Sequence, residues 1–505
     1  MESETSGGLR SKDLQRKVAL AAGLIGIIIL TIGFGIYEFT YESGIQDYIS
    51  DEVWYVSSAR TILLKYFGAT PTGLWDGMVR VTIQLTYPPS EKAYTERVNQ
   101  AREYIEGLGG RLVKGKEYYQ YKSNGDFLPA ICVDVPPEKL PAVNNTPYSS
   151  KYAVGYCYPN AKNILDYTNP EHPPLVKYLI GISMLTLGDR PEFWRIPSII
   201  AGALILILIF LSMRTILGNV MGGLLGAVAA LLTVLDISFR SLSMVALLDI
   251  FVALFTYLTY YFTLRGKLTY SSIALGFGFV SKFSGAFAGV PAVIEWIKKE
   301  KPAKVFLLLI YVPVLLLILI SIPFIIKDGF MDWWSVSVGG AFKWHLSQKT
   351  TGGPPQAMPW DWLLGRNPFP LHYVQTPTGE WKADLIAAGN PALYLLTTAL
   401  SIYLIPVFRK LADRGVTYVF TWGTYLMYIA IYVLGAKTQY SFYFIQIIPL
   451  LYTLLLLQLH FFLDRPKRVL EVGRKWVEIF RTFIDWLAGL VMVKVEVRVE
   501  PVEEL

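Results

Sequence analysis

Long apolar runs recur along the chain and are separated by shorter polar turns. The first covers residues 18–39, and a run of similar length covers 305–326. Each approaches the roughly 20 residues that a helix needs to cross the hydrocarbon core of a bilayer. Because a helix satisfies its own backbone hydrogen bonds, such runs predict transmembrane helices. With the second of these runs included, the spans predicted after the first lie near 196–212, 218–235, 245–264, 268–281, 284–297, 304–326, 391–408, 416–434 and 441–463.

A long polar segment follows the first span and shows a different pattern. Residues 79–87 alternate like a strand, and 91–108 have the periodicity of a helix that ends at Gly109 and Gly110. Residues 111–121 and 129–135 again look extended. The pattern predicts a small βαββ lobe over 75–160. Asn144 opens an Asn-X-Thr triplet, which is a frequent false positive for N-glycosylation.

Two further polar segments complete the predicted organisation. Residues 327–390 form a second large loop, which is rich in aromatic residues, histidine and proline. Residues 465–505 begin with an amphipathic pattern that suits a helix on the membrane surface better than another span. We therefore expect an all-α polytopic membrane protein with about ten transmembrane helices and a small α/β lobe in its first outer loop. Its parts are an N-terminus over 1–17, a membrane domain over 18–464 that contains both loops, and a tail over 465–505.

Composition and charge agree with this organisation and orient it. The chain is 53% hydrophobic and 17% charged, whereas soluble proteins carry about 25% charged residues. Basic residues precede the first span and occupy every second turn, which predicts that both termini are cytoplasmic and both large loops are outside. The net charge of +7 is explained by these flanks and needs no nucleic-acid partner. We expect a location in the plasma membrane.

The two cysteines, Cys132 and Cys157, lie in the same outer segment. An extracytoplasmic location would permit a disulfide between them. The alternative is two unrelated thiols.

Several polar residues lie near the predicted outer ends of helices. Asp51 and Glu52 begin an apolar-periodic stretch, where acids also stabilise a helix dipole. His172 and Lys177 flank the start of an interfacial helix, where prolines and a lysine at the membrane surface are also ordinary.

Asp249 is less ordinary, because it lies inside a predicted span, and ionisable residues there default to a functional hypothesis. Asp236 ends the preceding span, and Lys282 lies at an outer turn between two short helices. The second loop adds His345 and Trp360, although interfacial tryptophans alone would form an ordinary aromatic belt. These groups all converge on the outer face. Walker, GxSxG, HExxH and CxxC motifs do not occur in the sequence, which disfavours ATPases, serine hydrolases and zinc sites.

In their order along 45–450, these motifs resemble protein O-mannosyltransferases, a family of GT-C type membrane glycosyltransferases. The similar stretches are Asp51-Glu52, His172-Pro-Pro-Leu-Val-Lys177, Trp194-Arg195-Ile-Pro-Ser198, Asp236 with Leu247-Leu248-Asp249, Lys282-Phe283-Ser-Gly285 and Pro359-Trp-Asp-Trp-Leu363.

The chain also departs from the family pattern. Met244 stands where the family commonly has arginine, so one expected cation is missing unless Arg240 replaces it. Near the last span the family often has arginine, whereas Lys437 and Gln439 precede Tyr443 here. Aminoarabinose transferases share an Asp-Glu pair followed by an arginine, here Arg60, but usually have lysine in place of His172. This difference favours the mannosyltransferase branch.

The resemblance implies that a sugar is transferred, with inversion, from a polyprenyl or dolichyl phosphate to a hydroxyl group. Mannose is the sugar that it favours, and protein Ser or Thr is the acceptor that it favours. The resemblance also makes Asp51 the general base and Glu52 the residue that orients the acceptor or shares the charge. Cations would bind the donor phosphate, and other residues would line the pocket. The phosphate-binding candidates are Lys282, Arg60, Arg195 and Lys437, and the pocket candidates are His172, Lys177, Asp236, Asp249, His345, Trp360 and Tyr443.

Partners and cofactors follow from the same resemblance. We expect a polyprenyl-phosphate sugar donor, a protein or glycolipid acceptor and membrane lipid, with self-association left open. No cofactor is firmly implied, and a divalent metal at Asp51 and Glu52 stays an alternative.

Three other functions remain open. The first is a lipid- or glycan-directed transferase of the aminoarabinose kind. The second is a secondary transporter, which would favour inverted repeats and charges near the midplane; the charges here lie at outer helix ends. The third is a receptor or assembly component with a partner-binding outer lobe.

Overall fold

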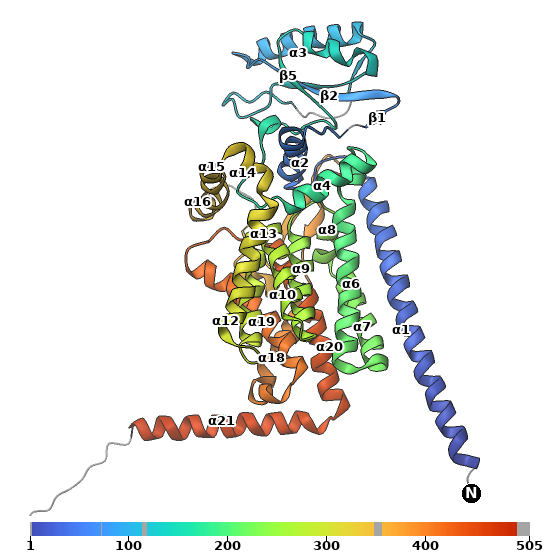
Figure 1. Cartoon of the computed structure of the whole chain (residues 1–505), viewed down its shortest axis with the longest axis vertical. Helices are drawn as coiled ribbons and strands as arrows, with labels where there is room; N and C mark the ends of the chain where they lie inside the picture. Colours follow the sequence, from blue (N-terminus) through green and yellow to red (C-terminus); the bar gives the residue numbers. More distant parts are fainter. Residues whose placement is uncertain (1–2, 72, 114–118, 348–355, 492–505) are drawn as a thin grey trace, which may run out of the picture.

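The computed structural model describes residues 3–71, 73–113, 119–347 and 356–491. A bundle of long helices forms the body of the molecule, and a small sheet lobe caps one end of it (Figure 1). The C-terminal helix lies across the opposite end (Figure 1).

The bundle helices follow the predicted apolar runs. By length and composition, five segments among the described residues could cross a membrane, or up to seven if each of two bent pairs is one span. The molecule is thus a multi-pass membrane protein. The prediction of about ten spans also counted α9 and α10, which have 16 and 14 residues and are short for a span. The bundle helices are α1 (Ser3–Ser43), α6 (Ile196–Leu217), α7 (Asn219–Leu235), α9 (Asp249–Leu264), α10 (Leu268–Ser281), α11 (Gly289–Trp296), α12 (Pro302–Phe306), α13 (Val312–Ile320), α18 (Pro391–Leu404), α19 (Asp413–Val433) and α20 (Ile448–Asp464).

Shorter helices lie at the end of the bundle that carries the lobe. After α1, helix α2 (Glu52–Phe67) and helix α4 (Leu175–Leu187) pack against each other beneath the lobe (Figure 1). The sequence indicated both. It did not indicate α5 (Pro191–Trp194) or α8 (Ile237–Ser243), and α8 follows α7 after a bend of 76°.

The lobe is an antiparallel sheet covered by one helix. Strand β2 (Met78–Leu85) lies between β4 (Ala130–Val135) and β5 (Ser149–Val154), and it also pairs with β1 (Leu74–Trp75). Helix α3 (Glu91–Gly107) and strand β3 (Arg111–Leu112) complete the predicted βαββ order. Strands β1 and β5 were not predicted. Part of the predicted strand over 111–121 lies outside the described residues.

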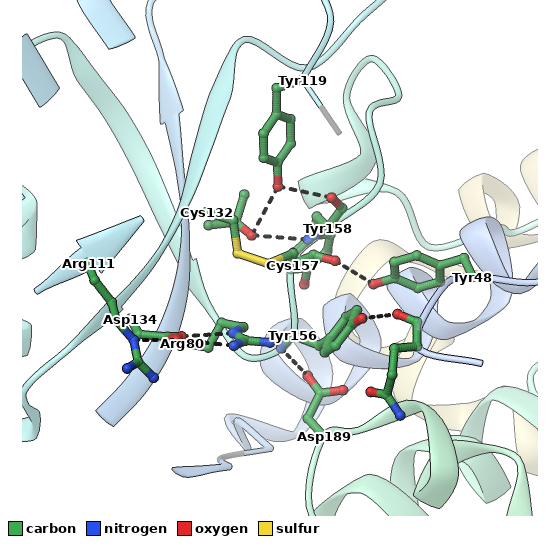
Figure 2. Close-up of a disulfide and its surroundings, with 12 residues drawn as sticks. Tyr48, Arg80, Arg111, Tyr119, Cys132, Asp134, Tyr156, Cys157, Tyr158 and Asp189 are labelled. Atoms are coloured by element: carbon green, nitrogen blue, oxygen red, sulfur yellow. Dashed lines mark hydrogen bonds and ion pairs between the residues drawn. A yellow bond between two sulfur atoms is a disulfide. The ribbon is translucent and has the colours of Figure 1, made fainter. Parts of the chain in front are cut away.

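A disulfide closes the lobe toward the bundle (Figure 2). It joins Cys132 on β4 to Cys157, with an S–S distance of 1.96 Å, so the first of the two alternatives for the cysteines is correct. Beside it, the backbone N–H of Tyr158 donates to the Thr82 hydroxyl at 3.0 Å, and the Tyr119 hydroxyl donates to the carbonyl of Tyr158 at 3.0 Å (Figure 2). The disulfide, together with these hydrogen bonds, therefore holds the segment around Cys157 against the sheet.

The second large loop, over residues 327–390, also contains regular structure that was not predicted. An antiparallel hairpin forms from β6 (Phe369–Gln375) and β7 (Trp381–Ala387), and β7 contacts α8. The loop begins with α14 (Ile322–Asp328), α15 (Phe330–Trp334) and α16 (Gly340–Ser347), and α17 (Pro359–Leu364) precedes the hairpin.

Candidate functional site

Asp51 is held at the start of α2, directly below the lobe. The preceding residue, Ser50, has φ 50°, a left-handed conformation that turns the chain from α1 into α2. Asp51 is the N-cap residue, but its side chain does not cap the helix. It is half-buried, and its carboxylate has no hydrogen bond or ion pair with any residue that the structure describes. This carboxylate is therefore free to accept a proton.

Lys282 and Asp249 form an ion pair near Asp51. Asp249 is the first residue of α9, and Lys282 directly follows α10. Lys282 Nζ lies 2.9 Å from Asp249 Oδ1, and both side chains are buried. The same Nζ lies 4.2 Å from the centre of the Tyr443 ring in η7 (Ser441–Gln446). Three segments far apart in the sequence thus meet around one cation.

The electrostatic environment of Asp51 favours a base that titrates near neutrality. Burial raises the pKa of Asp51 from its usual value near 3.8 to about 6. The positive charge of Lys282 opposes this rise in the pKa of Asp51, and the negative charge of Asp249 adds to it. Both charges therefore act directly on the Asp51 carboxylate.

Aromatic side chains lie around Asp51 and Lys282. Tyr55, one helical turn after Asp51, is within electrostatic range of Asp51, Asp249 and Tyr443. Its ring packs edge-on against His172, with the ring centres 5.8 Å apart. Two of the predicted pocket residues, His172 and Tyr443, thus lie near Asp51, Asp249 and Lys282. Tyr55 was missed, although its helical spacing from Asp51 could have suggested it.

Glu52 is fully buried and already paired. Its carboxylate receives two hydrogen bonds of 2.8 Å from the Arg195 guanidinium. It also accepts the backbone N–H groups of Ile49 and Ala246, each at 2.8 Å. These bonds join the loop before Asp51 to the loop before α9. Glu52 is placed to position the site and not to touch an acceptor, which corrects the sequence-based role.

Arg195 has no donor left for a donor phosphate. Besides its bonds to Glu52, it donates to the backbone carbonyls of Glu42, Ile45 and Asp47 at 3.1, 2.8 and 2.5 Å. A guanidinium has five N–H donors, and these contacts use all of them. Because its side chain is also fully buried, the predicted phosphate contact of Arg195 is wrong.

Arg60 is likewise committed elsewhere. Its guanidinium forms a two-point ion pair with Asp189 at 2.6 and 2.7 Å and donates to the Tyr48 hydroxyl at 2.8 Å. Asp189 also accepts the backbone N–H of Tyr156, which belongs to the lobe segment (Figure 2). Arg60 therefore attaches the lobe to α2. Because its side chain is only 2% exposed, the predicted phosphate contact is wrong here too.

Two further predicted pocket residues are structural. Lys177 is buried and donates to the backbone carbonyls of Asn169 and His172 at 2.5 and 2.8 Å, so it fixes the turn that carries His172. Asp236 caps α8 and accepts hydrogen bonds from the hydroxyls of Tyr394 and Tyr452.

Of the last three predicted residues, Lys437 and Trp360 have no hydrogen bond, ion pair or ring contact with Asp51, Asp249 or Lys282 among the residues that the structure describes. Lys437 is exposed, with Nζ 4.1 Å from the centre of the Tyr432 ring. Trp360 packs edge-on against the same ring at 5.3 Å. His345 belongs to α16, but its side chain lies outside the described residues.

Comparisons with known proteins give one match in sequence. Residues 171–326 match the model of the dolichyl-phosphate-mannose-protein mannosyltransferase family, which is less than half of the 505 residues. No curated protein matches the chain.

Solved structures give distant similarities. ArnT from Cupriavidus metallidurans bound to undecaprenyl phosphate has 12% identity and a TM-score of 0.45, and the match covers 93% of this chain and 66% of that one. The oligosaccharyltransferase AglB from Archaeoglobus fulgidus has 12% identity and a TM-score of 0.32, with 84% and 51% covered. The chain thus spans less than two thirds of either structure. The family resemblance seen in the motifs is confirmed by the sequence match over 171–326, which includes His172, Asp249 and Lys282: this segment is similar to the dolichyl-phosphate-mannose-protein mannosyltransferases.

Proposed function

We propose that this protein is a membrane glycosyltransferase that moves a sugar from a polyprenyl phosphate to a hydroxyl acceptor at the outer membrane face. The observation that carries the proposal is the unpaired, half-buried Asp51 carboxylate beside the Lys282–Asp249 ion pair. The match to the mannosyltransferase model over 171–326 supports mannose as the sugar and protein Ser or Thr as the acceptor.

In the proposed reaction, Asp51 takes the proton of the acceptor hydroxyl while the hydroxyl oxygen attacks the anomeric carbon. The bond from that carbon to the phosphate oxygen breaks, and the polyprenyl phosphate leaves with the electron pair. A single displacement of this kind inverts the anomeric centre. General-base catalysis typically contributes ~10²–10⁴-fold to the rate.

Lys282 is the cation best placed to stabilise the leaving phosphate. An ammonium group has three donors, and Asp249 accepts one of them. The remaining donors can reach phosphate oxygens without the loss of that ion pair. Fixed positive charge at a developing anion is a large term in catalysis when water is excluded, and the side chain of Lys282 is only 8% exposed.

The donor set does not suit a divalent metal at Asp51 and Glu52. Such ions bind through carboxylate oxygens, but both oxygens of Glu52 already accept from Arg195 and from backbone N–H groups. Asp51 alone remains open, so the proposed mechanism does not use a metal at this pair.

The test uses the purified protein in lipid nanodiscs with radiolabelled dolichyl-phosphate mannose and a Ser/Thr-rich peptide. We expect label in the peptide, loss of turnover in Asp51→Asn, and normal turnover in the matched control Asp126→Asn, which alters an exposed acid of the lobe. Label in a glycolipid acceptor but not in the peptide would keep the transferase and replace the acceptor. In a parallel reconstitution into sealed vesicles, uptake of sugar without covalent label would refute the transferase proposal.

A further inference from the structure

The C-terminal helix α21 (Lys467–Val491) leaves the bundle at a steep angle. Its axis makes an angle of 102° with α20. Figure 1 shows α20 running along the bundle and α21 extending sideways from the end opposite the lobe. Because the bundle helices cross the bilayer, a helix at about a right angle to them lies parallel to the membrane plane.

The first turns of α21 are fixed to the bundle. Val472 is 1% exposed and packs in a cluster with Val407 and Phe461. Trp476 Nε1 donates to the carbonyl of Tyr403 at 2.9 Å, and the Tyr403 hydroxyl donates to the carbonyl of Val469 at 2.7 Å. The direction of the helix is therefore set by contacts with the end of α18.

Beyond Trp476, the helix has further large apolar side chains, and these are exposed. Phe480 and Phe483 are 64% and 50% exposed, and Trp486 is 58% exposed. The spacing of three and four residues from Val472 to Trp476, Phe480 and Phe483 places them on one stripe of the helix. Since Val472 and Trp476 face the bundle, the whole stripe faces the side on which the bilayer lies.

The opposite face of α21 is polar and charged, and the helix as a whole has more basic than acidic residues. The helix contains five basic and three acidic residues, which gives a net charge of +2. Arg474, Lys475 and Arg481 are exposed on this face. The neighbouring turns add exposed basic residues, including Arg409 and Lys410 of η6 (Ile405–Lys410), which contacts α21. The charge complements an anionic surface.

We propose that α21 lies in the headgroup layer of the protein's own membrane, on the side opposite the lobe. Its apolar stripe would reach the acyl boundary, while its basic residues contact anionic lipid headgroups. Amphipathic helices of this composition bind through buried apolar area together with attraction to anionic lipids. A second copy of the chain is the less suitable occupant, because the fixed turns direct the stripe toward the bilayer and not along it.

Site-directed spin labels on the full chain in nanodiscs test the depth of the helix. The two native cysteines are joined to each other, so an introduced cysteine is the free thiol. We expect labels at Phe483→Cys and Leu487→Cys to be relaxed mainly by oxygen, which dissolves in lipid. Labels at the matched polar positions Glu478→Cys and Thr482→Cys should be relaxed mainly by a water-soluble nickel chelate. Equal access of the chelate to both faces would overturn the proposal.

Lipid composition tests the electrostatic part. We expect the label at Phe483→Cys to be more protected from the chelate when phosphatidylglycerol is added to phosphatidylcholine discs. The double variant Lys475→Glu with Arg481→Glu should lose this added protection. The expected weakening is roughly fivefold for each basic residue near an anionic surface. Lys122→Glu, an exposed lobe residue, is the matched control and should change nothing. Protection of position 483 that disappears when each disc holds a single copy would show self-association and would also overturn the proposal.

Discussion

A carboxylate that acts as a base must be ionised and unpaired, and Asp51 meets both conditions near neutral pH. Its pKa is raised to about 6 by burial, so it is ionised above that pH and protonated below it. Lys282 and Asp249 act on this pKa in opposite directions. The acid limb of the pH profile therefore reports on all three side chains.

We predict that kcat/KM rises with pH with a midpoint near the Asp51 pKa of about 6. Lys282→Met removes a nearby positive charge, so the midpoint should move to higher pH even if activity is much reduced. Asp249→Asn removes a nearby negative charge, so it should move to lower pH. Rates measured across pH 4–9 with each variant check this. A midpoint that does not move in either variant would remove Asp51 from the role of base.

The buried ion pair between Glu52 and Arg195 leads to a separate prediction about the stability of the folded protein. Removal of one partner of a buried ion pair leaves an uncompensated charge and typically costs ~3–5 kcal/mol. Arg195→Met should therefore lower the melting temperature strongly and reduce kcat more than it raises KM. Lys304→Met is the control, because its exposed pair with Glu300 is worth less than about 1 kcal/mol. Equal melting temperatures of the two variants would contradict the positioning role.

For individual residues, the charged side chains of the site could be identified from the sequence, but their hydrogen-bond and ion-pair partners could not. The convergence of Asp51, Asp249 and Lys282 could be predicted, because the pattern of basic turns places each of them at a helix end on the same side of the membrane. The commitment of Arg60 to Asp189 could not, since the two residues are 129 positions apart. Arg195 looked like a free outer cation for the same reason: Glu52 lies 143 positions away.

Among the elements, the junction between lobe and bundle depends on a glycine. Gly155 has φ +125°, and a Cβ there would lie 2.4 Å from Asp189 Oδ2, the atom that binds Arg60. The lobe chain therefore passes so close to the ion pair that a side chain would displace it.

We predict that Gly155→Ala loosens the lobe from the bundle. The matched control is Gly77→Ala, which has φ +77° in open space and should cost only the ~1–2 kcal/mol of a left-handed residue. Limited proteolysis of the full chain should cut within the lobe faster in Gly155→Ala than in Gly77→Ala. Identical cleavage rates would show that the contact does not hold the lobe.

Long apolar elements were predicted well, and short ones were not. The runs that became α6, α7 and α20 are visible in sequence because their length is set by the bilayer. Helices α5 and α8 are one or two turns long, and the β6–β7 hairpin is stabilised by contacts with α8, so neither has a sufficient local signal. The lobe strands β1 and β5 were missed for the same reason.

For the whole molecule, the site and α21 lie at opposite ends of the bundle (Figure 1). The basic turns predict that the end with α21 is cytoplasmic. We predict that a membrane-impermeant thiol reagent added outside intact cells labels Asn124→Cys in the lobe. It should label Lys410→Cys only after the cells are opened; both positions are exposed. The reverse pattern would place the site in the cytosol and end the proposed function.

The covalent bond between Cys132 and Cys157 also has a consequence for biogenesis. A cytosol maintained by glutathione keeps thiols reduced, so a chain inserted upside down would retain two free sulfhydryls. An alkylating tag that reacts with free thiols would therefore label only copies without the disulfide. On a gel run without reductant, the tagged fraction of newly made protein would measure the misinserted or immature copies. The redox state of the two cysteines would then report the orientation in which each molecule was inserted.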